Sequence, residues 1–268
     1  MKVVLVNGSP RAKGCTYTAL TEVEKVLQQN GIKTEIFQVG AKAVQGCIAC
    51  GKCLKTGKCV VDDIVNEFLS KVPETDGFVF GSPVHYAAAS GALTSFMDRA
   101  FYGKARLYKG KLGAAVVSCR RGGASAAFDQ INKYFTICQM PIVSSQYWNM
   151  VHGNTPEEVM RDEEGMQTMR TLGNNMAWLL KCIEAGREKG ITIPEGEPPS
   201  EPTSSGEDIL TCHCERSAVI SEIASSAFPH RNDAPELSLR YRTQCSNRSP
   251  WQSNKGERDN GRKSLSNQ

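Results

Sequence analysis

Short apolar runs alternate with longer segments of helical periodicity from residue 2 to about residue 194. Most of the short runs are almost continuously apolar, as strands are when both faces of a sheet are covered. Strands that alternate with helices in this way are typical of a parallel α/β sheet with helices on both faces. The predicted strands are residues 2–7, 33–39, 76–82, 112–119 and 141–148.

Apolar residues recur at three- and four-residue steps in the segments between these strands. This pattern predicts helices over residues 16–29 and 90–102, and a long helical segment within residues 156–189 that stops at Gly190. The long segment carries one apolar stripe, which we assign to the core. The stripe consists of Met169, Leu172, Met176, Leu179, Leu180 and Ile183.

The composition changes after Pro194, where the sequence EGEPPSEPTSSGED has the Pro, Glu, Ser and Gly content of a linker. We therefore expect one folded domain over residues 1–194, followed over residues 195–268 by a linker and a mostly disordered tail. Within the tail only residues 219–228 favour a short helix, and the cysteines and histidine of residues 212–214 lack the partners of a metal site. Its CHCERSAVIS and PHRNDA stretches resemble peptides read from bacterial interspersed repeat DNA, which predicts an appended segment.

Composition and charge narrow the class of protein. The 268 residues are 40% hydrophobic and 22% charged, which is the range of globular proteins. The net charge of +4 comes from basic and acidic residues mixed along the chain, so we expect no nucleic-acid partner. No apolar run approaches the ~18 residues of a membrane span, and the N-terminus turns polar too soon for a signal peptide. These features predict a cytoplasmic protein without a membrane partner, in which the 11 cysteines serve as thiols, metal ligands or redox groups rather than as disulfides.

The loop VNGSPRAKGCTYTAL, residues 6–20, leaves the first predicted strand and enters the first predicted helix. A helix N-terminus offers unpaired N–H groups and a positive dipole end, and here Ser9 and Thr16 add hydroxyls while Arg11 adds charge. The loop is therefore a candidate phosphate site, although it has neither the GxxxxGK[ST] nor the GxGxxG pattern of nucleotide loops. The alternative is an ordinary strand-to-helix turn.

Two further loops follow predicted strands and are expected at the same sheet edge, because ligands of open parallel sheets bind outside the carboxyl ends of the strands. In the first, GSPVHYAAASGALTSFMDR, residues 83–86 are suited to form a wall against a flat ring. The second, SCRRGGASA, supplies glycines for close backbone approach and arginines for negative charge. The candidate binding residues of the two loops are Pro83, Val84, His85, Tyr86, Ser118, Arg120, Gly122 and Gly123.

Four cysteines, Cys47, Cys50, Cys53 and Cys59, lie in the insertion formed by residues 41–62 with the spacing C-x2-C-x2-C-x5-C. The short gaps and the neighbouring glycines allow four thiolates to surround one [4Fe–4S] cluster. Zinc suits thiolates as well, and free thiols that serve packing or a dimer contact are a third possibility. Asp62 and Asp63, which follow, are read as caps of a helix over residues 64–69 and not as ligands.

The stretches NGSPRAKGCT and GSPVHYAAASGALTSFMDR, with the four-cysteine segment between them, resemble the flavodoxin-like NADPH-dependent FMN reductase superfamily, and most closely its iron–sulfur flavoproteins. The resemblance covers about residues 1–190. It implies a flavodoxin-like doubly wound, five-stranded parallel sheet in the order 2-1-3-4-5. It also implies FMN with its phosphate in the 8–18 loop and its isoalloxazine ring against the 82–88 and 118–123 loops.

The resemblance also assigns individual residues. Ser9, Arg11 and Thr16 match the family's phosphate contacts, and Pro83, Val84 and Tyr86 match its flavin wall. Two positions depart from the family's pattern. Cys15 stands where many relatives have Asn, a stronger hydrogen-bonding side chain, and His85 stands where Tyr is frequent and serves either as a donor to the flavin edge or as a lid residue.

The function that this resemblance implies is an FMN-dependent oxidoreductase. Electrons would come from NAD(P)H or a protein donor and pass to a small-molecule or protein acceptor. The cluster would relay single electrons, and the flavin would carry out the chemistry without a catalytic side chain. Two alternatives are a flavodoxin-type electron carrier without turnover of a small substrate, and a structural protein on the same fold. The long cysteine insertion needs a surface to order it, which predicts a homo-oligomer.

Overall fold

The computed structural model describes residues 1–40 and 42–197, which all belong to one compact unit. The predicted helix over residues 219–228 and the cysteines and histidine of residues 212–214 lie outside the described residues. No helix of the described part is long and apolar enough to cross a membrane.

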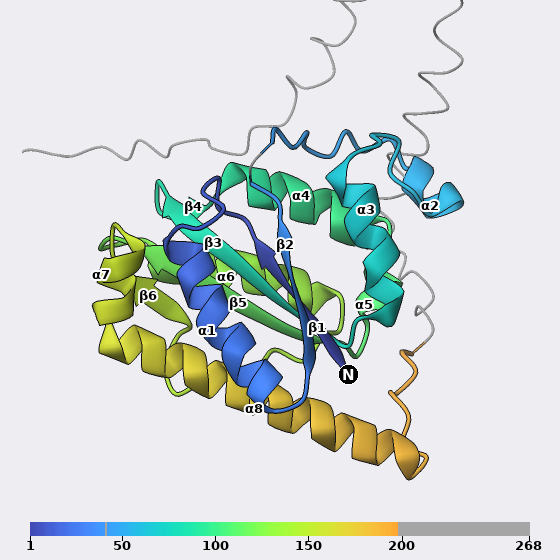
Figure 1. The fold of residues 1–268 in the computed structure, drawn as a ribbon. Coiled ribbons are helices and arrows are strands. Elements are labelled where there is room, and N and C mark those ends of the chain that lie inside the picture. The colour runs from blue at the N-terminus through green and yellow to red at the C-terminus, as the bar shows by residue number, and fades with distance from the viewer. Residues whose placement is uncertain (41, 198–268) are drawn as a thin grey trace, which may run out of the picture. The chain divides into compact units, whose positions relative to one another are not determined.

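A parallel sheet forms the centre of the unit (Figure 1). Its strands are β1 (Lys2–Asn7), β2 (Lys33–Gln38), β3 (Gly77–His85), β5 (Leu112–Cys119) and β6 (Met150–His152). They run parallel in the order β2-β1-β3-β5-β6, which confirms the predicted 2-1-3-4-5 topology. A sixth strand, β4 (Ala88–Ala89), pairs antiparallel with the end of β3. The sheet therefore has one short strand more than the five expected.

The last parallel strand lies later in the chain than residues 141–148, where the sequence predicted it. The backbone of that segment touches β5 only at one bridge, where Val143 donates to Gly113 O over 2.8 Å. The segment then leaves the sheet, and its aromatic side chains Tyr147 and Trp148 are more than half exposed. The apolar character that suggested a buried strand thus comes partly from surface residues.

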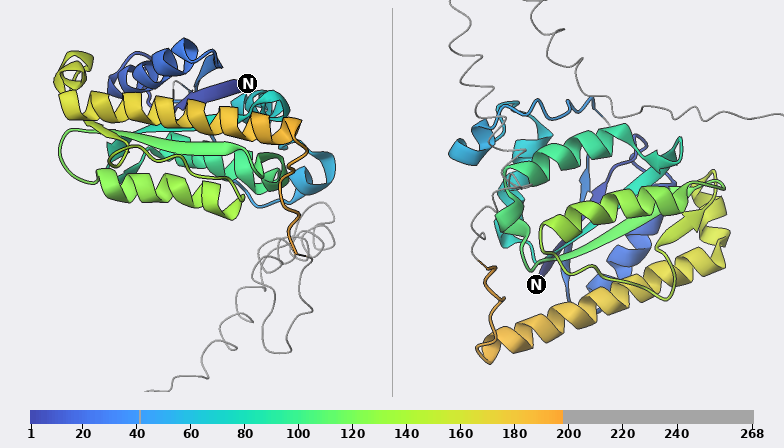
Figure 2. Two further views of the ribbon diagram at one scale, coloured as in Figure 1. Left: turned by 90° about the horizontal axis from the view of Figure 1, so that it is seen from below. Right: turned by 180° about the vertical axis from the view of Figure 1, so that it is seen from behind.

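Helices cover both faces of the sheet (Figure 2). One face carries α1 (Cys15–Gln29), α7 (Pro156–Arg161) and α8 (Glu163–Glu188). The other face carries α3 (Ile64–Lys71), the 3-10 turn η1 (Val72–Glu74), α4 (Gly91–Tyr102), α5 (Ala105–Tyr108) and α6 (Ala124–Ile137). The short helix α2 (Lys52–Thr56) lies in the cysteine segment and buries none of its residues.

Two details of the helices differ from the prediction. The long helical segment is divided at Asp162, whose carboxylate accepts from Gly165 N over 3.0 Å and so caps α8. Helix α6 was not predicted, although its buried residues Ala127, Ile131 and Phe135 recur at four-residue steps. Its position directly after the glycines of the third loop places a helix N-terminus at the edge where a ligand is expected.

The continuous apolar run of β1 follows from burial on both faces. Val3 and Leu5 pack with α1 and α8, whereas Val4 and Val6 pack with α3 and α4. All four side chains are fully buried, and each such burial contributes about 1.5–3 kcal/mol to the stability of the fold. The central strands therefore hold the loops at their carboxyl ends on a rigid base.

Candidate functional site

The loops that follow β1, β3 and β5 meet at the carboxyl edge of the sheet, as predicted. Gly8 N donates to Gly81 O over 2.8 Å, and the Ser90 hydroxyl donates to Gly8 O over 2.8 Å. Thr16 Oγ1 and Ser118 Oγ form a buried hydrogen bond of 2.8 Å between α1 and the end of β5. Hydrogen bonds within the protein thus join three segments that are far apart in the sequence.

The loop after β1 is supported from β1 and β2. The fully buried Asn7 donates from Nδ2 to Gln38 Oε1 over 2.7 Å, and Gln38 Nε2 donates to Ser9 O over 2.7 Å. Asn7 Oδ1 also accepts from Ser9 N over 3.1 Å. Gly40 passes so close to this loop that a Cβ there would overlap the carbonyl of Ser9. The loop therefore has one backbone path, which is set by neighbouring strand ends.

Helix α1 begins at this loop with its positive dipole end exposed to it. Its N-cap is Gly14, and no side chain among the described residues accepts from its first N–H groups. No acidic residue lies in its first turn, and Arg11 adds a positive charge in the loop. Free N–H groups with a positive dipole end and a nearby guanidinium suit a phosphate group.

The side chain of Cys15 points to a different part of the edge. Its Sγ lies 3.6 Å from the carbonyl oxygen of Gly153, in the loop after β6. Burial raises the pKa of this thiol above its ordinary value, so the neutral thiol is the stable form. The structure therefore directs Cys15 to a carbonyl, and the backbone N–H groups and the hydroxyl of Ser9 are the candidate phosphate donors that remain in this loop.

The second loop is a tight hairpin with strained geometry at its tip. His85 pairs with Ala88, and the two residues between them, Tyr86 and Ala87, have φ of +50° and +59°. Two-residue hairpins with positive φ usually contain Asn and Gly, because side chains with a Cβ disfavour this conformation. Tyr86 is fully exposed at this tip. A strained, exposed aromatic residue at a ligand edge is typical of a functional contact.

The third loop lies directly against this hairpin. Gly123 has φ of +86°, and a Cβ there would lie 2.5 Å from Ala87 Cα and 3.1 Å from Val84 Cγ1. Glycine is thus required both by the backbone conformation and by the close approach of the hairpin. The other predicted residues of the two loops, Pro83, His85, Arg120 and Gly122, are half-buried or exposed along the same edge. The structure thus places the tip of the second loop against Gly123 of the third loop, while Ser118 is buried beneath them at the end of β5.

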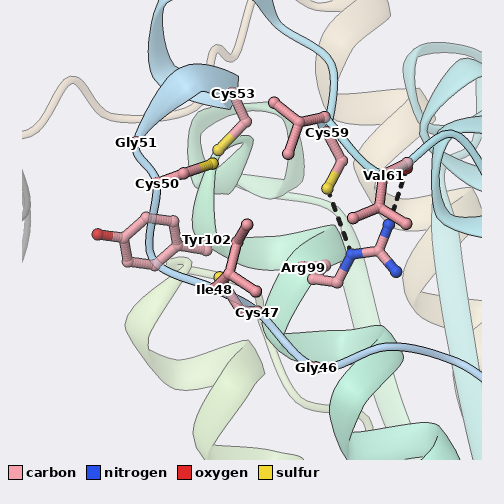
Figure 3. A pocket seen from close by; sticks show the side chains of 11 residues that line it. Gly46, Cys47, Ile48, Cys50, Gly51, Cys53, Cys59, Val61, Arg99 and Tyr102 are labelled. Carbon is pink, nitrogen blue, oxygen red and sulfur yellow. Dashed lines mark hydrogen bonds between the residues drawn. The ribbon is translucent and has the colours of Figure 1, made fainter. Parts of the chain in front are cut away.

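The cysteine segment forms a second candidate site beside α4. Cys47, Cys50, Cys53 and Cys59 all line one pocket, which also receives Arg99 and Tyr102 from α4 (Figure 3). The pocket encloses about 380 Å³ of empty space, the open solvent at its mouth included. All four thiols are free of disulfides.

The end of α4 is shaped to receive Cys53. A Cβ at Gly103 would overlap both the Sγ and the Cβ of Cys53. Gly103 has φ of −87°, which any residue adopts, so the backbone conformation does not require glycine there. Glycine is required at position 103 by the close approach of the Cys53 side chain.

Arg99 ties the cysteine segment to the folded domain. Its side chain is 1% exposed, and its guanidinium holds the carboxylate of Asp63 in a bidentate pair with N–O distances of 2.6 and 2.8 Å. The same guanidinium donates to Gln45 O over 3.2 Å and to Val61 O over 2.9 Å. Asp63 also caps α3 by accepting from Val65 N, which confirms the predicted capping role. One buried cation thus fixes both ends of the cysteine segment.

The remaining donor of Arg99 reaches a cysteine. Nε lies 3.3 Å from Cys59 Sγ and donates to it (Figure 3). Burial acts to lower the pKa of Arg99, but hydrogen bonds to Asp63 and Cys59 outweigh it and raise the pKa further above its ordinary value. Arg99 therefore stays charged while it is buried.

The donor set of this pocket fits a metal cluster. Four thiol groups line one space, and soft thiolates are ligands of iron–sulfur clusters and of zinc. Burial, followed by the neighbouring cysteines, raises the pKa of Cys53, so this thiol would have to lose its proton when metal binds. In the described residues no three His, Cys, Asp or Glu side chains converge on one point that would hold a single ion. The fit is therefore one of ligand chemistry, because the pocket is lined by four thiols that are not gathered around one point.

Several residues that organise these sites were not assigned from the sequence. Asn7, Gln38 and Ser90 hold the loop after β1, and Arg99 holds the cysteine segment. Arg99 left a usable signal, because it lies among the apolar positions of the predicted helix over residues 90–102. An arginine on a buried helix face needs a partner.

Comparison with known proteins gives consistent results. A family model described as NADPH-dependent FMN reductase matches residues 1–155. An iron–sulfur flavoprotein of Methanocaldococcus jannaschii is 33% identical over 192 residues, which cover 69% of this chain and 100% of the relative. An iron–sulfur flavoprotein of Archaeoglobus fulgidus is 29% identical over 196 residues, which cover 68% of this chain and 98% of the relative.

Solved structures show the same fold at low sequence identity. RosB, solved with bound 8-demethyl-8-formylriboflavin-5'-phosphate, has a TM-score of 0.57 and 13% identity over 94% of this chain and 100% of its own. An NAD(P)H:quinone oxidoreductase from Methanothermobacter marburgensis has a TM-score of 0.52 and 16% identity over 66% of this chain and 96% of its own. By its sequence match and its fold, the chain belongs to the NADPH-dependent FMN reductase family, with iron–sulfur flavoproteins among its relatives.

Proposed function

We propose that the chain is an FMN-dependent oxidoreductase that takes electrons from NAD(P)H or a protein donor and passes them to a small-molecule or protein acceptor. We further propose that Cys47, Cys50, Cys53 and Cys59 hold a [4Fe–4S] cluster that relays single electrons. The observation that carries the proposal is the meeting of three loops at the carboxyl edge of the sheet, in a chain whose family is that of FMN reductases.

The residues of the edge divide into two groups by the part of FMN they would bind. The N–H groups of the loop after β1 and of the first turn of α1 would hold the phosphate, with Ser9 and Arg11 as donors. Pro83, Val84 and Tyr86 on one side, and Gly122 and Gly123 on the other, would hold the ring. His85 would donate to the ring edge or cover it.

The protein's part in the chemistry is to position and to tune. FMN, when bound, supplies the exchange of two electrons as a hydride or of one electron at a time. The buried hydrogen bonds beneath the loop after β1 keep its N–H groups oriented, so binding needs little reorganisation. Arg120 and Arg121 add positive charge near the ring. Positive charge there would stabilise a reduced, more negative ring.

The cluster part of the proposal is supported by the shared pocket of the four thiols and by relatives named iron–sulfur flavoproteins. The segment presents three exposed apolar side chains: Ile48 and Val60 line this pocket, and Leu54 lies on α2. Large exposed apolar residues grouped in one segment are typical of a contact surface. They support the predicted homo-oligomer.

An anaerobic absorbance spectrum with iron, sulfide and zinc analysis would test both parts on the full chain after reconstitution with FMN, iron and sulfide. We expect about one FMN per chain, reduced by NADH or NADPH, together with about four irons and four sulfides. Turnover of quinones or free flavin with NAD(P)H would mark a reductase. Reduction by a partner protein without such turnover would mark a flavodoxin-type carrier. A desalted protein without flavin absorbance would contradict the proposal.

A further inference from the structure

We infer that Arg99 is a positioning residue that sets the reduction potential of the cluster through the sulfur of Cys59. The inference rests on the proposed cluster. It adds that one positive charge, placed at the sulfur of Cys59, tunes the reduction potential of that cluster. The observation that carries it is the contact of 3.3 Å between Nε of a buried, charged guanidinium and one of the four thiols of the pocket.

The orientation of Arg99 is fixed by bonds that do not involve the cysteine. Both Nη atoms are held by the carboxylate of Asp63, by Val61 O and by Gln45 O. Since the guanidinium is planar, these bonds also fix the direction of Nε–H. Figure 3 shows Nε pointing at the sulfur of Cys59, while the sulfurs of Cys50 and Cys53 lie across the pocket. The donor is thus aimed at Cys59 before any metal is present.

A charged donor on a ligand sulfur affects the two redox states differently. Reduction adds an electron to the cluster, and a hydrogen bond from a cation stabilises the more negative, reduced state. Hydrogen bonds to the ligand sulfurs are among the main determinants of cluster potentials. Arg99 should therefore make the cluster easier to reduce.

Asp63 opposes this effect because it partly neutralises the same guanidinium. Its carboxylate is 25% exposed and pairs with both Nη atoms, whereas Nε remains with Cys59. Removal of the charge of Asp63 should leave the Nε donor in place and increase the positive field at the sulfur. Arg99 and Asp63 are thus expected to shift the potential in opposite directions.

The test is an anaerobic redox titration of the full chain, followed by electron paramagnetic resonance, in wild type, Arg99→Met and Asp63→Asn. Arg99→Met should make one-electron reduction of the cluster at least tenfold less favourable, which corresponds to about 59 mV. Asp63→Asn should make reduction more favourable, because asparagine still caps α3 but carries no charge. Lys104→Met is the matched control: its ammonium lies near Gly57 of the same segment, and its loss should have a much smaller effect.

Opposite shifts in the two variants would support the inference, since a loosened segment would move both potentials in the same direction. Arg99→Met that binds a cluster at an unchanged potential would overturn it. If Arg99→Met binds no cluster, Asp63→Asn decides: a higher potential supports the inference, and an equal or lower one overturns it. A wild type that assembles no cluster would instead overturn the proposed cluster itself, and the inference with it.

Discussion

The carboxyl edge of the sheet and the cysteine segment are two candidate sites of one chain, but they are held in place in different ways. At the edge, buried Asn7 and neighbouring strand ends fix the loops through hydrogen bonds between elements of the core. In the cysteine segment, α2 buries no residue, and order depends on Arg99 and on Asn66, which pairs with both backbone groups of Cys59.

The difference indicates that the fold alone holds the loops of the carboxyl edge, whereas the proposed cluster would supply much of the order of the cysteine segment. A loop supported by buried strand residues keeps its shape when it is empty, because its hydrogen bonds are part of the core. A segment with few buried contacts gains much of its stability from the group that it binds. Mutations should therefore separate the two sites, and each prediction below alters one of them while the other serves as internal control.

The largest effect is expected from Cys53→Ser. Loss of one of four thiolates should remove most of the iron and sulfide. FMN should remain at about one per chain, since Cys53 packs against Gly103 at the C-terminal end of α4, whereas α4 meets the carboxyl edge at its other end, at Ser90. Metal analysis and the flavin absorbance of the same sample measure both. Cys182→Ser is the matched control, an exposed thiol on α8 outside the segment. Full iron content in Cys53→Ser would show that this thiol is not a ligand.

Gly40→Ala should have the opposite effect: FMN binding should weaken while the iron content stays the same. The new Cβ would overlap the carbonyl of Ser9 and displace the loop after β1, so the affinity for FMN should fall by about a hundredfold, or roughly 2.8 kcal/mol. Iron content should not change. Fluorescence titration with FMN measures the affinity. Gly91→Ala, where a Cβ meets no neighbour within 4 Å, should bind FMN as wild type does. Equal affinities in the two variants would contradict the role given to this loop.

A smaller effect is expected from Gly103→Ala, which changes the support of the cysteine segment without removing a thiol. The methyl group would press on Cys53, so we expect cluster assembly with a several-fold faster loss of iron to a chelator. FMN affinity should stay at the wild-type value. A wild-type rate of iron loss would mean that the segment rearranges when it binds metal.

The fold and the edge loops were predictable from the sequence because their signals are local. The apolar runs of β1, β3 and β5 and the loops that follow them are continuous stretches. The strand order, which the family resemblance implied, agreed with the structure. The prediction of a strand over residues 141–148 was wrong because the apolar residues of this segment do not share one environment: Val143 is buried, but Tyr147 is exposed. The sequence of this segment alone does not show which of its apolar residues are buried.

The supports of the sites were not predictable because they depend on contacts between distant residues. Asn7 and Gln38 are 31 positions apart, and Arg99 and Cys59 are 40 positions apart. Gly103 and Gly123 require glycine because other segments approach them, and the sequence does not show those neighbours. Sequence patterns thus indicated which residues are candidates to face a ligand, and the structure was needed to identify the residues that support them.

The smallest effect concerns the pH dependence of the Arg99–Asp63 pair, which ties the cysteine segment to α3 and α4. Burial acts to raise the pKa of Asp63, but hydrogen bonds from Arg99 and Val65 N outweigh it, so the pKa lies below its ordinary value. A lowered folded-state pKa stabilises the fold above the unfolded pKa of about 3.9, and the contribution is lost as the pH falls through the lower folded value. The pair's stabilisation should therefore be complete at neutral pH and fade below about pH 4.

Urea unfolding of metal-free wild type and Asp63→Asn at several pH values measures the contribution of this pair to the free energy of unfolding. We expect a difference in the free energy of unfolding of roughly 1–2 kcal/mol at pH 7, below the full value of a buried pair because a quarter of Asp63 is exposed. The difference should stay the same down to about pH 4 and narrow below it. Asp129→Asn, which alters an exposed carboxylate of α6, should differ little from wild type at pH 7. A difference for Asp63→Asn that does not narrow with pH would mean that the charge of Asp63 contributes nothing, and that Arg99 is held by the backbone carbonyls of Gln45 and Val61 alone.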